Sequence, residues 1–114
     1  MSTAADRLAA IQAIYMDAMG NETADLAKAQ TSADVSAIQA NVANAQLAYY
    51  TAEAAALTNN NADVEAAYTA ASAALKEVKQ TRANAAEIPT LLGALNGATG
   101  AATDLLELAK AAGA

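Results

Sequence analysis

Apolar residues recur at alternating intervals of three and four along residues 33–86, and this spacing constrains the fold more than any other feature. The first set is Val35, Ile38, Val42, Ala45 and Tyr49, and the second is Val64, Ala67, Ala71, Ala74 and Val78. Such spacing places each set on one stripe of an α-helix and suits a shallow, coiled-coil-like crossing. The sequence therefore predicts an all-α, Ala-rich antiparallel hairpin of helices at about 33–57 and 62–86, with the two stripes as its seam.

The turn of this hairpin is predicted at Thr58-Asn59-Asn60-Asn61. Asn tolerates turn and left-handed backbone conformations, and Asn60 or Asn61 can cap the helix that follows. A short connection of this kind favours antiparallel neighbours.

A helix is also predicted before the hairpin. Thr3 and Asp6 resemble a capping box, and Gly20 suits the end of a helix, so the first helix is expected at about 3–19. Thr31 with Asp34 offers a further cap inside the next segment, and the sequence leaves open whether 22–57 is one continuous helix. The expected domain is a single one over 1–114, with helices at about 3–19, 22–57, 62–87 and 90–112.

The C-terminal segment is unusual because it combines Pro and Gly with Leu. Pro89 suits the first turn of a new helix. Gly93 and Gly97 form a small-xxx-small pair that permits close helix approach, whereas Gly in a helix interior costs about 1 kcal/mol relative to Ala. Three Gly residues in eight therefore indicate a break, a hinge or a tight contact, and whether 93–100 is helical stays open.

Alanine dominates the apolar content, because 37 of the 114 residues are Ala and there is no Phe or Trp. Methyl side chains bury little area, and burial contributes about 25 cal/mol per Å². We therefore expect a thin core that copies of the chain complete by assembly. A small monomeric bundle is the alternative.

Charge is scarce and acidic. The net charge is −6, which disfavours nucleic acid and anionic membrane surfaces as partners. Residues 35–52 and 88–103 carry no charge at all. Amide and hydroxyl side chains recur through both runs, so neither is expected to span a membrane, and both are candidates for surfaces that another subunit covers.

No pattern typical of catalysis occurs. The chain has no Cys and no His, and its carboxylates are scattered over predicted caps and polar faces. We therefore expect a protein that is not an enzyme and has no metal and no cofactor. The start of the chain lacks the pattern of a cleavable signal peptide, so we expect a cytoplasmic or virion protein, or one exported by a signal-independent route.

These observations favour a structural subunit that assembles with copies of itself into a helical filament, shell or virion-type lattice. The expected contacts lie in the uncharged runs: Gln39, Gln46, Tyr50, Leu92, Gly93 and Gly97. The alternative is a small secreted or adaptor hairpin, of the secretion-system type, that binds another protein.

Overall fold

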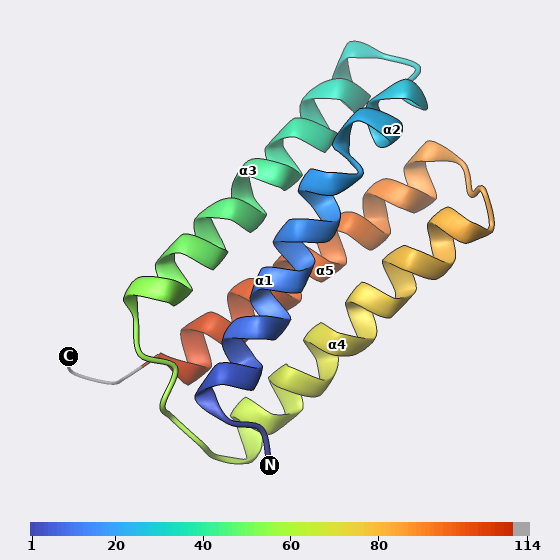
Figure 1. The fold of residues 1–114 in the computed structure, drawn as a ribbon. Coiled ribbons are helices and arrows are strands. Elements are labelled where there is room, and N and C mark those ends of the chain that lie inside the picture. Colours follow the sequence, from blue (N-terminus) through green and yellow to red (C-terminus); the bar gives the residue numbers. More distant parts are fainter. Residues whose placement is uncertain (111–114) are drawn as a thin grey trace.

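The chain is all-helical, as predicted. The computed structural model describes residues 1–110. Its helices are α1 (Ala4–Gly20), α2 (Glu22–Ala27), α3 (Ser32–Ala54), α4 (Ala62–Ala83) and α5 (Ile88–Ala109). The four long helices run side by side as a bundle, and the short α2 lies at one end (Figure 1). The predicted end of the last helix, residues 111–112, lies outside the described residues.

Local capping signals place the helix starts. The Thr3 hydroxyl accepts from the Asp6 amide and the Asp6 carboxylate accepts from the Thr3 amide, which completes the predicted capping box. The Asn61 side chain accepts from the Val64 amide at 2.9 Å and caps α4.

The segment 22–57 is two helices and not one. The Thr31 hydroxyl accepts from the Asp34 amide at 3.1 Å, and the Asp34 carboxylate accepts from the Gln30 amide at 3.0 Å. These side-chain bonds replace helical backbone bonds and start α3 afresh at Ser32. In contrast, α5 runs unbroken through residues 93–100, so its glycines produce neither a break nor a hinge.

The predicted seam between α3 and α4 is wrong, although the two helices are consecutive and antiparallel (Figure 1). No Cα atom of α3 lies within 8 Å of a Cα atom of α4. Instead α3 packs on α1 and α5, while α4 packs chiefly on α5. The 3-4 spacing identifies the inward face of each helix but not its partner, because stripes of Ala fit more than one neighbour.

The predicted seam residues still point inward. Ile38, Ala45, Val64, Ala71 and Val78 are buried, and Val35, Val42, Tyr49, Ala67 and Ala74 are partly buried. The Tyr49 ring stacks on Tyr15 of α1, with ring centroids 5.7 Å apart, and not on α4.

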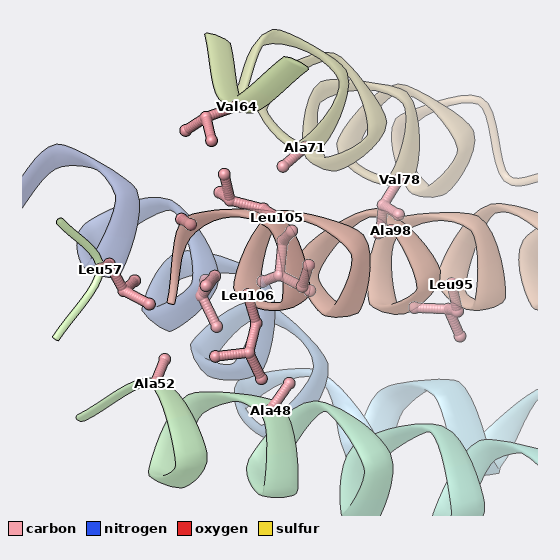
Figure 2. Close-up of a cluster of buried hydrophobic side chains, with 14 of the residues drawn as sticks. Ala48, Ala52, Leu57, Val64, Ala71, Val78, Leu95, Ala98, Leu105 and Leu106 are labelled. Carbon is pink, nitrogen blue, oxygen red and sulfur yellow. The ribbon is translucent and has the colours of Figure 1, made fainter. Parts of the chain in front are cut away.

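The hub of the core is α5. Figure 2 shows this helix between α3 and α4, with Val64, Ala71 and Val78 approaching it from one side and Ala48 and Ala52 from the other. Its own buried apolar side chains include Ile88, Leu91, Leu95, Leu105 and Leu106. One chain therefore closes a continuous core by itself, and the expectation that copies are needed to complete the core is wrong. The Leu-rich α5 supplies the apolar volume that the Ala stripes lack.

The connection from α3 to α4 is anchored at two residues, Leu57 and Asn59. Leu57 is buried in the core, and its carbonyl accepts from Arg7 Nη1 at 2.8 Å. Asn59 covers the C-terminal end of α5: its amide donates to the Ala109 carbonyl at 3.0 Å, and its Nδ2 donates to the Lys110 carbonyl at 2.7 Å. These anchors hold the loop across the end of the bundle, so α4 lies beside α5.

Replacing Asn59 with Ala should lower the free energy of unfolding by about 1 kcal/mol, because carbonyls at the end of α5 lose a side-chain donor. Urea denaturation followed by circular dichroism measures the change. The neighbouring Asn60→Ala is the matched control, since Asn60 is exposed. Equal effects of the two substitutions would show that Asn59 does not cap α5.

Candidate functional surface

Burying a polar side chain is costly unless the group is paired, so an unpaired buried group would be a first sign of a site. Every fully buried side-chain nitrogen or oxygen in residues 1–110 has a hydrogen-bond partner. In the same part of the chain, no group of three or more acidic, His or Cys side chains is placed to hold a metal ion. None of the helices described is both long and apolar enough to cross a membrane.

Arg82 joins three helices. Its Nη1 lies 2.6 Å from Asp17 Oδ2 of α1, while its Nε and Nη2 bind both carboxylate oxygens of Asp25 of α2 at 3.1 and 2.9 Å. Burial opposes the charged form of Arg82, but the hydrogen bonds to Asp25 and Asp17 outweigh it and raise the pKa of Arg82. All the ionic groups here pair with one another, so this cluster is structural.

A second cluster ties the N-terminus to α4. The Ser2 hydroxyl and amide both donate to Glu65 Oε1 at 2.8 Å, and Arg7 Nη2 lies 3.7 Å from the same oxygen. The hydrogen bond from the Ser2 hydroxyl is the main reason why the pKa of Glu65 falls below its ordinary value of 4.5.

This lowered pKa predicts a pH dependence. A carboxylate with a depressed pKa in the folded state stabilises the fold above its unfolded pKa of about 4.5, and this stabilisation is lost as the pH falls through the folded value. The melting temperature of the wild type should therefore fall more steeply below pH 4.5 than that of Glu65→Gln. Ser2→Ala should flatten the profile in part, because it removes one donor. Parallel profiles of wild type and Glu65→Gln would refute the assignment.

A groove of about 570 Å³ runs between α3 and α5. Its lining is mostly uncharged: Asn41, Asn44, Leu47, Ala48 and Thr51 from α3, and Asn96, Thr99, Gly100, Thr103 and Leu106 from α5, with Asp104 and Glu107 towards the end of α5. Leu47 is 66% exposed at this groove. The groove therefore lies between the two charge-free runs of the sequence.

Asn41 gives this groove a polar floor. The side chain is only 3% exposed, and its Oδ1 accepts from Thr99 Oγ1 at 2.7 Å. The Nδ2 donor has no hydrogen-bond partner in the described chain. Every fully buried side-chain donor in the described residues has a partner, so the unpartnered Nδ2 is not fully buried. It reaches the surface through the groove that Asn41 lines.

The glycines of α5 lie on its outer face. Gly93, Gly97 and Gly100 are exposed, and a Cβ atom added at any of them would meet nothing within 4 Å. They therefore make no tight contact within the chain, contrary to one of the expectations from their spacing. Gly93 and Gly97 also line a second, smaller groove between α5 and α4, beside Ala74 and Glu77.

The structure divides the predicted contact residues between two surfaces. Gly93 and Gly97 are on the outer face of α5, whereas Leu92 is half-buried against the core. Gln39 is exposed on α3, and Gln46 Nε2 lies 3.3 Å from the Tyr50 hydroxyl and 3.5 Å from that of Tyr15. Tyr50 is 53% exposed and packs edge-on against Tyr15 of α1, with ring centroids 6.1 Å apart.

Sequence reasoning missed Asn41 and Leu47. Asn41 interrupts an inward series with 3-4 spacing that includes Ile38, Ala45 and Ala48, and this position alone could have indicated a buried amide. Leu47 carries no comparable signal, because its exposure depends on which neighbours α3 has.

Fold and surface together define a class of protein: an all-α bundle with a groove between α3 and α5 that is lined mainly by amide, hydroxyl and small apolar groups. Comparison of the chain with protein-family models, curated proteins and solved structures finds no match.

Proposed function

We propose that this protein is a non-catalytic structural subunit that assembles with copies of itself through the face formed by α3 and α5. The observation that carries the proposal is the pair of exposed glycines, Gly97 and Gly100, in the interior of α5. Each costs about 1 kcal/mol relative to Ala in a helix, and nothing within 4 Å of the missing Cβ atoms requires glycine. Close approach of another molecule is the use that remains.

Charge supports the same face. A chain with a net charge of −6 repels its own copies. This repulsion is weakest where charge-free runs meet, and residues 35–52 and 88–103 flank one groove. An interface there also avoids most of the desolvation cost of charged side chains.

A filament or shell needs a second contact surface, because a single two-fold contact closes on a dimer. The face of α1 and α3 that carries Gln39, Gln46 and Tyr50 is the candidate for this second contact. Exposed Tyr is favoured at interfaces because its ring is apolar and its hydroxyl forms hydrogen bonds. We therefore expect the Tyr50→Ala variant to form dimers but no larger assemblies. Negative-stain micrographs of this variant should show no filaments or shells.

The test of the proposal is Gly97→Gln. The new side chain points to solvent in the monomer and removes a helix-interior glycine, so the free energy of unfolding should rise by somewhat less than about 1 kcal/mol. The same substitution should abolish association, which sedimentation velocity measures. Ala73→Gln on the exposed side of α4 is the control that should leave assembly intact. Unchanged association of Gly97→Gln would contradict the role of this face.

The alternative, a small binding module for another protein, gains support from the closed core, because the fold does not require further copies. The same groove and the exposed Leu47 would then receive the other protein. A chain that stays monomeric alone and forms a 1:1 complex with a partner would favour this function.

A further inference from the structure

The outer face of α5 and the groove beside it indicate how two copies meet as well as where. We infer that α5 of one copy packs antiparallel on α5 of a second copy, across a two-fold axis between Gly97 and Gly100. This inference rests on the proposed self-assembly and adds the partner segment and its register.

The spacing of the glycines favours this register. A two-fold axis midway between Gly97 and Gly100 sets each of them opposite the other residue of the partner. A Cβ atom added at either position would meet nothing within 4 Å, so two backbones can come together at the centre of the contact. The same register sets Gly93 opposite the partner's Asp104.

The distribution of charge on α5 favours the antiparallel pairing. On the outer face of α5 the acidic groups lie at one end, at Asp104 and Glu107, and Glu107 is paired with Lys110 at 2.8 Å. A parallel pairing would set the two Asp104 carboxylates side by side. The antiparallel pairing sets each one against the uncharged stretch around Gly93 of the other copy, which removes this repulsion.

A buried amide on α3 favours the same register. Asn41 is almost fully buried, and its Nδ2 has no partner within the described chain although it reaches the groove that Gly100 also lines. In the antiparallel register the partner's Asn96 lies at the level of Ala101 along the helix, one residue beyond Gly100, which lines this groove. Its side-chain oxygen is an acceptor that completes the hydrogen bonding of Asn41.

The outer face of α5 alone offers a small contact area. A helix of 22 residues is about 33 Å long, and with half of each flanking groove it is about 10 Å wide, which gives roughly 330 Å² per copy. This is below the approximately 800 Å² per partner of a standard interface, so α5 alone predicts a weak dimer.

The experiment places a charge at Gly93 and measures the dimer dissociation constant by sedimentation equilibrium. Gly93→Lys, Gly93→Gln and Gly93→Glu have similar bulk, and position 93 is open in the monomer. In the Gly93→Lys variant, the new lysine should pair with the partner's Asp104, and this pair forms twice per dimer. The dissociation constant of this variant should therefore be about fivefold lower than that of Gly93→Gln. The dissociation constant of Gly93→Glu should be about fivefold higher than that of Gly93→Gln, because the two carboxylates repel each other. The difference between the dissociation constants of Gly93→Lys and Gly93→Glu should become smaller in about 0.5 M salt, where the Debye length is on the order of 4 Å.

Two further variants identify the partner group. Adding Asp104→Asn to Gly93→Lys should cancel the gain in dimer affinity that Gly93→Lys produces. Adding Glu77→Gln should leave that gain, although Glu77 lines the groove next to Gly93 within the same copy. Circular dichroism confirms that each variant is folded.

The outcomes separate the inference from the proposed function. A wild type that stays monomeric overturns both. A wild type that associates, with Gly93→Lys, Gly93→Gln and Gly93→Glu all equal, overturns the antiparallel register and leaves self-assembly standing. A gain that Asp104→Asn cancels supports the register.

Discussion

Replacing Arg82 with Met should lower the free energy of unfolding by about 3 kcal/mol. The guanidinium binds both oxygens of Asp25, which is 1% exposed, and also Asp17. Without it, a buried carboxylate is left unpaired, and removal of one partner of a buried ion pair typically costs about 3–5 kcal/mol. The lower end of this range applies because the Arg82 side chain retains 13% exposure.

Lys79→Met is the matched control, because Lys79 is an exposed cation on the same helix. Its effect should lie within about 0.5 kcal/mol of zero. Urea denaturation of the two variants gives the comparison. If Arg82→Met were no more destabilising than Lys79→Met, the three-helix ion cluster would have no structural role.

The second large effect is expected at Leu105, a fully buried residue of α5, the helix that lies between α3 and α4 in Figure 2. Leu105→Ala should lower the free energy of unfolding by about 3 kcal/mol, because it removes buried methyl groups and leaves a cavity that rigid helices fill only in part. Leu108→Ala, three residues further along the helix and exposed, should change it by less than about 1 kcal/mol. Similar losses at the two positions would show that α5 is not the hub of the core.

Local features of this fold were predictable from the sequence. Thr3 with Asp6, Thr31 with Asp34, and Asn61 each bind backbone amides within three residues, so a short stretch of sequence contains the whole signal. The inward stripes of α3 and α4 were also predictable, because helical periodicity alone determines which residues share a face.

The pairing of helices was not predictable in this way. It depends on contacts between distant residues, such as Arg7 with the Leu57 carbonyl and Asn59 with the end of α5. Arg7 and Arg82 are also largely buried, because each binds groups that are far away in the sequence: the Leu57 carbonyl for Arg7, and Asp17 and Asp25 for Arg82.

The candidate site was predictable only in part, because some of its residues come together only through the pairing of α3 with α5. The glycines of α5 stood out because Gly is costly in a helix. Asn41 and Leu47 become part of the site only once α3 lies beside α5, which the sequence pattern did not predict. The uncharged runs 35–52 and 88–103 were visible separately, and the fold brings them to one groove.

Sedimentation velocity of the wild-type chain beside Gly97→Gln tests the central claim most directly. Self-assembly through α5 predicts a wild-type species at twice the 11.4 kDa mass of one chain or above, and a monomer for Gly97→Gln with equal or higher stability. A wild type that sediments as a monomer at every concentration, or a Gly97→Gln variant that assembles like the wild type, would contradict the claim.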